Sequence, residues 1–356
     1  GYEGIWTGSN VGLGLDIAMK AGLAVRDLEF VAWAPLAVSG TNVVLPIGLL
    51  ADGATLHHSN GTPIDVDLTA DTTALATAIG SNSDAVLDAR NMGESSVWWA
   101  QTFELVSQRL GINMKKQTVP IHPRVATTIG GIATDEHGRA VTGKWSRWFT
   151  GLYAAGDSAC SGLHGAGLIA GNRLLDSMAG GAAAGEHAAD HAGKTSHTGR
   201  AALEIALGAV EADLDFDMAG AEEGPVQRAG PLFAKLAEVM QASMGYSRDA
   251  QGLESALESL DALADSAGKL HLDDSGRLFN TNLLEALRLK AGIRLAKATV
   301  QSAMSRTESR GTHQRTDFTE QDDEQLHHTL IDIDGNLSTL AIRKGTSGTW
   351  VLSPSE

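Results

Sequence analysis

The sequence predicts a mixed α/β fold whose second half is helical, and three observations support this prediction. Short apolar runs that suit strands are interleaved with helical segments as far as residue 193. Residues 194–325 carry apolar side chains at helical spacing, which is typical of a helix bundle. Residues 326–356 contain alternating runs, which indicate a small C-terminal β extension.

Composition narrows the class of protein. The chain has 356 residues and a net charge of −16, and 43% of its residues are hydrophobic. This length suits two or three domains, and this composition suits a packed core. The excess of acidic residues argues against nucleic acid and against an anionic membrane surface as partners, because both require a basic face. We therefore expect a cytoplasmic protein.

The chain contains one cysteine, Cys160. It therefore forms no disulfide framework, and it holds neither a cysteine-rich zinc site nor an iron–sulfur cluster by itself. No apolar run reaches the roughly 20 residues that a membrane-spanning helix needs, so we expect no direct membrane insertion. The first residues, Gly1-Tyr2-Glu3-Gly4, resemble neither a signal peptide nor a Met start.

The first third of the chain divides into two parts. Residues 1–36 suit a short helix followed by a strand that Pro35 ends. Residues 37–116 have the pattern of a separate α+β unit, with short strands around Asp-Gly and Asn-Gly turns. A helix is predicted over residues 98–110, and Gly111 is its expected end.

Residues 117–193 are predicted to be the most structured stretch. An extended run ends at Gly130-Gly131, and a short apolar strand over residues 151–157 ends in Gly156-Asp157. A helix rich in Ala and Gly is expected from Asn172 to about residue 192. Its small side chains allow it to pack closely against a sheet or a ligand.

The last part of the chain carries three strong helical patterns, over residues 231–244, 250–264 and 282–304. Two alternating runs follow, at residues 329–333 and 340–342. We expect a helical unit and then the β extension.

Two glycine-rich motifs invite functional interpretations that their context does not support. Residues 165–170 fit the G-x-G-x-x-A pattern of a dinucleotide fingerprint, but no strand directly precedes them and a helix occupies the region where the second strand should lie. Residues 156–160 are one glycine short of the G-x-S-x-G elbow of hydrolases, and no Asp and His partners follow in order. We interpret Cys160 as a small buried residue.

Three pairs of histidines are spaced closely enough to be compared with metal-binding patterns. His187 and His191 lie four residues apart on the predicted helix, which places both imidazoles on one face. Their order differs from H-E-x-x-H, so a solvated helix face is the preferred interpretation. The adjacent pairs, His57-His58 and His327-His328, diverge if they lie on strands and are expected at the surface. We predict no metal site.

Several ordered motifs together resemble a known family. They are P-I-H-P at 120–123, I-G-G-I-A-T-D-E-H-G-R at 129–139, G-L-Y-A-A-G-D at 151–157, H-G-A at 164–166, N-R-L-L at 172–175, and E-S-R-G-T-H-Q-R-T-D at 308–317. In this order and spacing they are similar to the flavoprotein subunits of succinate dehydrogenase and fumarate reductase. L-aspartate oxidase belongs to the same superfamily.

The resemblance implies an architecture. The implied α/β fold contains a split, Rossmann-like FAD-binding domain that lacks its first lobe. Residues 1–36 would be a remnant of this domain, and residues 117–193 would be its second lobe. Residues 37–116 would be an inserted α+β capping domain, residues 194–325 a helical domain and residues 326–356 the β extension. In the family a G-x-G-x-x-G phosphate loop precedes everything present here, so we expect a fragment or an incomplete gene product.

The resemblance also assigns roles. FAD is the implied cofactor, and an iron–sulfur electron-transfer subunit is the implied partner, through which the chain could lie on the cytoplasmic face of a membrane. Asp157 would accept hydrogen bonds from the hydroxyl groups of the cofactor, and the backbone near Asn172 would approach the flavin ring. The implied cofactor-binding residues are Gly130, Gly131, Ala155, Gly156, Asp157, Asn172, Arg173 and Leu174.

The sequence departs from the family where a dicarboxylate should bind. Ala34, Leu36, Ala126, Leu168 and, in a weaker alignment, Thr77 stand where the resemblance implies histidine, threonine or arginine side chains. Each lost charged hydrogen bond typically costs about 1.5–3 kcal/mol. Fumarate or succinate would therefore be held poorly.

Two interpretations remain. The pocket could serve a different, more apolar substrate, with polar contacts from His122, Arg124, His164 or Arg173. Alternatively, the chain is a flavoprotein-like subunit without catalytic activity, or an enzyme of the L-aspartate oxidase type. Arg124 and His164 are the candidate catalytic residues, although Arg124 equally suits a surface loop and the family gives His164 no role in proton transfer.

Overall fold

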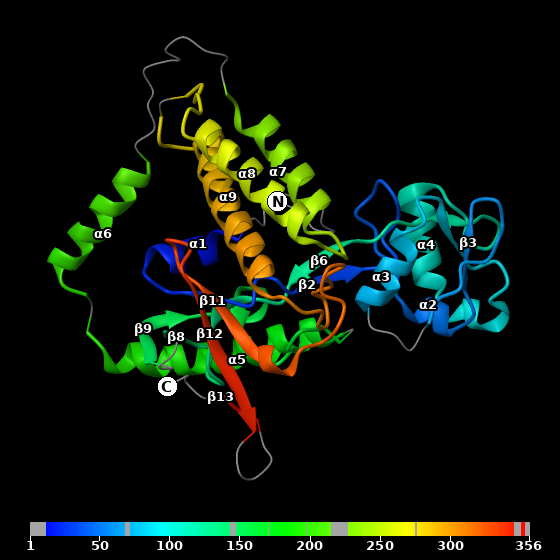
Figure 1. Cartoon of the computed structure of the whole chain (residues 1–356), viewed down its shortest axis with the longest axis horizontal. Coiled ribbons are helices and arrows are strands. Elements are labelled where there is room, and N and C mark those ends of the chain that lie inside the picture. Colours follow the sequence, from blue (N-terminus) through cyan, green and yellow to red (C-terminus); the bar gives the residue numbers. More distant parts are fainter. Residues whose placement is uncertain are drawn as a thin grey trace.

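The computed structural model describes residues 12–67, 72–142, 147–169, 171–196, 198–214, 227–274, 276–344 and 350–352. Helices α7 to α9 lie on one side of the molecule, the unit around α2, α3 and α4 projects at one end, and α5 lies beneath a central sheet (Figure 1). The fold is mixed α/β, as the sequence predicts. No helix of the described residues is both long and apolar enough to cross a membrane.

A six-stranded sheet collects segments from both ends of the chain. Its strand order is β10 (Ala159–Cys160), β7 (Gly131–Ala133), β1 (Val25–Arg26), β11 (His327–Ile331), β12 (Leu337–Lys344) and β13 (Trp350–Leu352). Strand β1 pairs antiparallel with both β7 and β11, with Val25 opposite Ile132 and Ile331. Helix α1 (Leu13–Lys20) and β1 share a small core with Ala298 of α9. The C-terminal strands therefore continue the central sheet rather than forming an isolated ribbon.

Residues from Leu36 to Ile121, called here the α2–α4 unit, enclose a core of their own. This unit contains α2 (Gly48–Ala51), β3 (Thr55–His58), α3 (Thr72–Gly80), β4 (Ala85–Asp88), η1 (Gly93–Val97), α4 (Ala100–Leu110) and β5 (Val119–Pro120). Strands β3, β4 and β5 form its sheet, and α4 ends at Gly111 in the left-handed region (φ 70°), as predicted. Two antiparallel strands, β2 (Val31–Ala34) and β6 (Arg124–Thr128), lead into and out of the unit.

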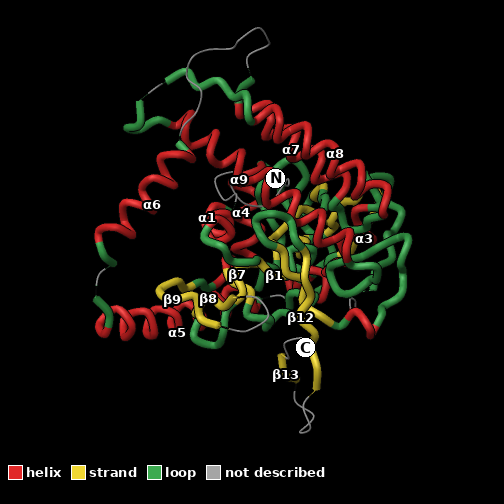
Figure 2. The backbone as a smooth tube through the Cα atoms, turned by 60° about the vertical axis from the view of Figure 1, so that its left-hand side comes forward, coloured by secondary structure: helices red, strands yellow, loops and turns green. Residues whose placement is uncertain are grey.

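Three helices form the core of the C-terminal half. Helices α7 (Ala229–Ser243), α8 (Ala250–Ala267) and α9 (Thr281–Ser305) share one apolar core. Asp249 and Asn280 cap α8 and α9, each through a side-chain oxygen that accepts a backbone N–H of the first turn. Helix α6 (Arg200–Asp213) lies apart from this bundle in both views (Figures 1 and 2). The three predicted helices are present, with ends shifted by three residues at most.

Helix α5 (Asn172–Lys194) packs beneath the hairpin of β8 (Arg139–Thr142) and β9 (Arg147–Tyr153). The solvated face predicted for His187 and His191 is wrong, because both rings are half-buried against this hairpin. The Tyr153 hydroxyl lies 3.1 Å from His187 Nδ1, and the rings of Trp148 and His191 are 4.7 Å apart. The described residues contain no group of three or more His, Cys, Asp or Glu side chains that could hold a metal ion.

Two further predictions require correction. The strand expected over residues 151–157 ends at Tyr153, and Gly156-Asp157 begin a short 3₁₀ turn, η3 (Gly156–Ser158), because the left-handed Gly156 (φ +60°) breaks the extended backbone. His328, expected at the surface, is 6% exposed, and its Nδ1 forms a short contact with Asp27 Oδ2. His327 beside it is half-buried. Both residues pair with β12, His327 opposite Ala341 and His328 opposite Leu340, and the contact with Asp27 covers the His328 ring.

Candidate functional site

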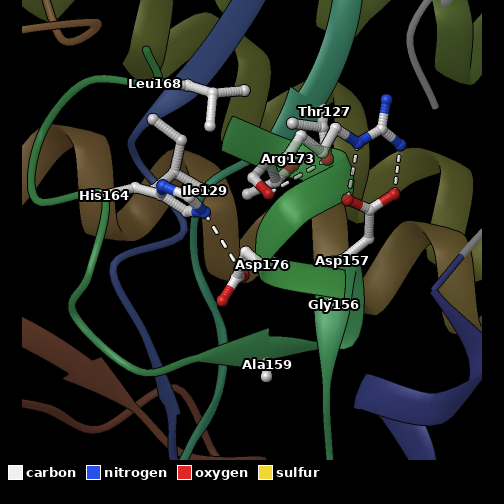
Figure 3. Close-up of a pocket in the computed structure, with 10 residues that line it drawn as sticks. Thr127, Ile129, Gly156, Asp157, Ala159, His164, Leu168, Arg173 and Asp176 are labelled. Atoms are coloured by element: carbon white, nitrogen blue, oxygen red, sulfur yellow. Dashed lines mark hydrogen bonds and ion pairs between the residues drawn. The ribbon is translucent and has the colours of Figure 1, made fainter. Parts of the chain in front are cut away.

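A pocket lies where the predicted cofactor segments meet. It is a small, open hollow between β6, η3, the start of α5 and the loop of residues 161–169, called here the pocket loop (Figure 3). The lining residues are Thr127, Thr128, Ile129, Gly156, Asp157, Ala159, His164, Leu168, Arg173 and Asp176. Gly156, Asp157, His164, Leu168 and Arg173 were singled out from the sequence. The structure brings these five together.

Gly156 allows the η3 turn to approach α5. A Cβ atom on Gly156 would lie 2.8 Å from Ser177 Oγ, and its φ of +60° favours glycine. At this junction Arg173 Nε donates to Asp157 Oδ1 at 2.6 Å, and Arg173 Nη2 makes a second, short bond to Asp157 Oδ2. This bidentate pair fixes the Asp157 carboxylate at the rim of the pocket.

A second carboxylate faces a histidine across the pocket. His164 Nε2 lies 3.2 Å from Asp176 Oδ2, and both side chains are largely buried (Figure 3). Because an ionised carboxylate only accepts hydrogen bonds, Nε2 carries the proton and Nδ1 is free to act on a ligand. Among the described residues no hydrogen bond to His164 Nδ1 is present. This arrangement can move a proton at Nδ1.

The charged groups of the pocket do not suit a dianion. Its lining contains two carboxylates, Asp157 and Asp176, one permanent cation, Arg173, and the imidazole of His164. Arg173 already binds Asp157 through two hydrogen bonds. A dicarboxylate placed here would meet two like charges before it met an uncommitted cation.

The remaining implied cofactor residues lie around the pocket. Ala155 directly precedes the η3 turn, Asn172 begins α5, and the Leu174 side chain is largely exposed on that helix. Gly130 and Gly131 have a structural explanation, since Cβ atoms there would lie 2.3 Å from Asp27 O and 2.7 Å from Ser158 O. Close packing of backbones around β7 requires glycine at both positions.

The other polar candidates lie outside the pocket lining. Arg124 on β6 donates to Thr41 O at 2.5 Å, at the start of the α2–α4 unit. His122 is half-buried just before that strand. Thr77 on α3 donates its hydroxyl group to Thr73 O within the same helix. None of these three is among the residues that line the pocket.

Cys160 is buried, as predicted from the sequence, and faces Asp27 Oδ2 at 3.6 Å. Burial raises the pKa of its thiol, and the neighbouring Asp27 carboxylate raises it further. The Ser158 hydroxyl donates to Ala155 O within the η3 turn. Neither residue is an activated nucleophile.

The sequence interpretation missed Thr127, Thr128, Ile129, Ala159 and Asp176. For Asp176 a signal was present, because it lies four residues after Asn172 and so on the same face of α5. Thr127 and Thr128 directly precede Ile129-Gly130-Gly131, but nothing in their own pattern distinguished them from ordinary strand residues.

The pocket fits one part of the FAD that the resemblance implies. Cβ atoms on Gly165, Gly167 and Gly171 would meet nothing within 4 Å, so the backbone near the pocket is open to a close-fitting ligand. Ile129 and Leu168 offer an apolar wall, and Asp157 and Thr127 offer hydrogen-bonding groups. A flavin with its ribityl chain needs this combination.

Two family models match this chain. Residues 6–174 match the family described as "FAD binding domain", and residues 233–353 match "Fumarate reductase flavoprotein C-term". The fumarate reductase flavoprotein subunit of Escherichia coli K12 is 30% identical over 372 residues, which cover 93% of this chain and 59% of that protein. The succinate dehydrogenase flavoprotein subunit of Coxiella burnetii is also 30% identical, over 93% of this chain and 60% of that protein. The chain thus spans about 60% of the length of these relatives.

Solved structures with a similar fold include two kinds of reductase. The FrdA chain of E. coli quinol fumarate reductase superposes with a TM-score of 0.83 at 26% identity, over 100% of this chain and 65% of that one. Adenylylsulfate reductase from Archaeoglobus fulgidus superposes with a TM-score of 0.68 at 16% identity, over 96% of this chain and 63% of that one, which is a likeness of fold alone.

Proposed function

The chain belongs to the succinate dehydrogenase and fumarate reductase flavoprotein family, and from this premise we propose that it is an FAD-dependent oxidoreductase whose substrate is not a standard dicarboxylate. The observation that carries the proposal is the meeting of Asp157 and Arg173 in a pocket whose charges disfavour a dianion. The fold itself does not fix the substrate, because one architecture serves many reactions.

Asp157, Thr127 and the glycine-lined backbone near Asn172 would hold the cofactor. Asp157 keeps acceptor capacity beside its two bonds to Arg173, because an ionised carboxylate offers about four lone-pair sites. Gly130 and Gly131 allow the backbone of β7 to lie close to Asp27 and to Ser158 of the η3 turn, which Ala155 directly precedes. When bound, the flavin supplies hydride transfer between its N5 atom and a substrate carbon.

The substrate we propose is neutral or carries a single negative charge. Leu168 is apolar where the resemblance implies a carboxylate-binding arginine, so a second carboxylate would meet no cation there and would lie near Asp176. Ala34 and Ala126 add no charge on the neighbouring strands β2 and β6.

Of the two candidate catalytic residues, His164 is supported better than Arg124. His164 lines the pocket and is oriented by Asp176, whereas Arg124 bonds to Thr41 O in the α2–α4 unit. We propose that His164 gives or takes a proton at Nδ1, and that Asp176 holds the ring in the tautomer this requires.

The partner we propose is an iron–sulfur subunit, because a reduced flavin can pass its two electrons one at a time to iron–sulfur clusters, and this chain has one cysteine, which is buried. Such a partner would hold the acidic chain at the cytoplasmic face of a membrane.

The test uses the full-length gene product. We expect a flavin absorbance band, negligible fumarate reduction, and slow reoxidation of the reduced flavin by fumarate. Normal fumarate turnover would contradict the substrate proposal. A colourless protein would contradict flavin binding and support a subunit without catalytic activity, and oxidation of L-aspartate would support the aspartate oxidase alternative.

A further inference from the structure

A tight turn from the C-terminal half is in close backbone contact with the pocket loop. This turn, residues 310–313, is called here the Gly311 turn, and it is closed by hydrogen bonds between the backbones of Arg310 and His313. Thr312 N donates to Ala166 O at 2.8 Å, and a Cβ on Gly311 would lie 2.2 Å from the same oxygen. Ala166 lies midway between His164 and Leu168. The contact therefore touches the loop between its two pocket-lining residues.

The Gly311 turn is itself held by a buried chain of charges. Arg310 binds Glu308 through two hydrogen bonds of 2.8 and 3.0 Å, Glu308 accepts from Arg306 at 2.8 Å, and Arg306 Nε donates to Glu29 Oε1 at 2.9 Å. The side chains of Glu29, Arg306 and Glu308 are completely buried. Buried charge pairs of this kind are weak evidence for stability, because desolvation offsets much of their attraction, but they constrain geometry.

His313 anchors the other side of the Gly311 turn. Its Nδ1 accepts from Arg248 Nη1 at 2.9 Å, so Nε2 must carry the proton that it donates to Arg306 O at 3.2 Å. Arg248 Nη1 also donates to Glu29 O at 2.7 Å. The imidazole is therefore held in one tautomer and one orientation.

Phe30 provides a second route from this network to the pocket. Its ring meets His313 edge-on with centroids 6.4 Å apart, and the guanidinium carbon of Arg306 lies 5.0 Å from its centre. Phe30 also belongs to the apolar cluster that contains Ile129 and packs against Ala166 and Leu168. Two of these, Ile129 and Leu168, line the pocket.

We propose that the Gly311 turn, with Phe30, is a positioning element that sets where His164 and Leu168 stand in the pocket. Gly311 is required because any side chain there would push Ala166 away. The role of the pocket as a flavin site rests on the proposed function, whereas the mechanical coupling of the turn to the pocket loop does not.

The main test compares two substitutions in the full-length gene product. Gly311→Ala introduces the clash with Ala166. Gly61→Ala is the matched control, because Gly61 also has a left-handed backbone (φ +88°), has nothing within 4 Å of its Cβ position and lies between β3 and Pro63, outside the pocket lining. Amide hydrogen exchange of residues 161–169 is measured by mass spectrometry.

For Gly311→Ala we expect exchange in the pocket loop to become about tenfold faster, while exchange in the α2–α4 unit is unchanged. Gly61→Ala should leave the pocket loop unaffected. Unchanged exchange of the pocket loop in a folded Gly311→Ala protein would overturn the proposal, and so would equal effects of both variants.

A second variant covers the case in which Gly311→Ala does not fold. Phe30→Leu keeps an apolar contact with Ile129 and Leu168 and removes the ring that meets His313 and Arg306. We expect faster exchange of the pocket loop and a shifted flavin reduction potential. An unchanged loop and an unchanged potential would overturn the proposal. If the gene product binds no flavin, hydrogen exchange still tests the positioning role, and only the proposed function fails.

Discussion

Arg306 and Glu29 form an ion pair in which both side chains are completely buried, with Arg306 Nε 2.9 Å from Glu29 Oε1. Arg306 also donates to Glu308, to the carbonyl oxygens of Gln325 and His327, and to Thr329. One guanidinium thus joins the segment before β2, the segment after α9 and the C-terminal strand β11.

We expect Arg306→Met to lower the free energy of unfolding by about 3–5 kcal/mol, because removal of one partner leaves Glu29 and Glu308 buried without their cation. Denaturant unfolding measures this change. Arg200→Met is the matched control, because Arg200 forms an ion pair with Glu204 on the surface of α6, where its side chain is 91% exposed. The stability of that control should be unchanged, and a similarly small effect of Arg306→Met would contradict the prediction.

His313 makes stability depend on pH. Burial holds the pKa of His313 well below its usual range, and the Arg248 guanidinium lowers this pKa further. The unfolded chain therefore binds a proton below about pH 6.5 that the folded chain does not, so stability is fully present above that pH and is lost as the pH falls. The slope contributed by this residue approaches about 1.4 kcal/mol per pH unit.

His313→Gln tests this dependence, because an amide can accept from Arg248 and donate to Arg306 O but does not titrate. We expect the variant to be less stable than the original protein at pH 7.5 and to lose less stability between pH 6.5 and 5. Thermal unfolding at both pH values measures the difference. Parallel losses in both proteins would show that His313 is not responsible.

Asp317 also makes stability depend on pH, in a more acidic range than His313 does. Two hydrogen bonds from Arg315, at 2.7 and 2.6 Å, lower the pKa of Asp317 to about 2, and its Oδ2 also accepts from Ala250 N at the start of α8. The stabilisation is present above the unfolded value of about 3.9 and is lost as the pH falls toward 2.

Asp317→Asn should therefore cost about 1 kcal/mol at neutral pH, a figure reduced for the partial exposure of the side chain, and little at pH 2.5. Asp265→Asn on the exposed face of α8 is the control and should change neither value. A constant cost of Asp317→Asn across this range of pH would contradict the assignment.

Gly156 lines the pocket, and we expect a side chain at this position to lower the stability of the protein. Gly156→Ala and Gly151→Ala both place a side chain on a left-handed backbone, but only the first meets an obstacle, Ser177 Oγ at 2.8 Å. We expect Gly156→Ala to cost about 1–3 kcal/mol more than Gly151→Ala, which is the usual range for overpacking. Thermal unfolding of both variants measures this. Equal costs would show that the η3 turn can move away from α5 freely.

Sequence patterns predicted the helices well and the long-range pairings poorly. Helices α5, α7, α8 and α9 were predicted because periodic apolar positions specify a helix locally. The pairing of β1 with β11 was not, because a two-residue strand carries no pattern and its partner lies about 300 residues away in the chain. The buried charges of Arg306 and Glu308 were also missed, since charged residues are almost never fully buried unless they are paired.

In the pocket, too, the residues of local motifs were predicted, whereas residues that packing brings in from other elements were not. Gly156, Asp157 and Arg173 were singled out from the family motifs, and they meet in the structure. Asp176 and Thr127 were missed because their contribution depends on how α5 and β6 face each other. The domain boundaries and the roles of the cofactor-binding residues remain predictions.

The substrate proposal predicts that binding of a dicarboxylate can be restored by adding charge. Leu168→Arg combined with Ala126→His places a cation on the pocket loop and an imidazole on β6, next to the pocket-lining Thr127. Each new charged hydrogen bond is worth about 1.5–3 kcal/mol, so we expect malonate to perturb the flavin spectrum of the double variant at concentrations that leave the original protein unchanged.

The control for this experiment is Leu203→Arg, which adds the same charge on α6 at a position that is 59% exposed and does not line the pocket. General attraction of anions to added positive charge would make malonate act on both variants, with an effect that salt screens out. A response confined to the double variant and retained in salt requires that residues 126 and 168 face one shared site. Failure of malonate to perturb that variant would show that Leu168 and Ala126 do not occupy the positions of a lost dicarboxylate clamp.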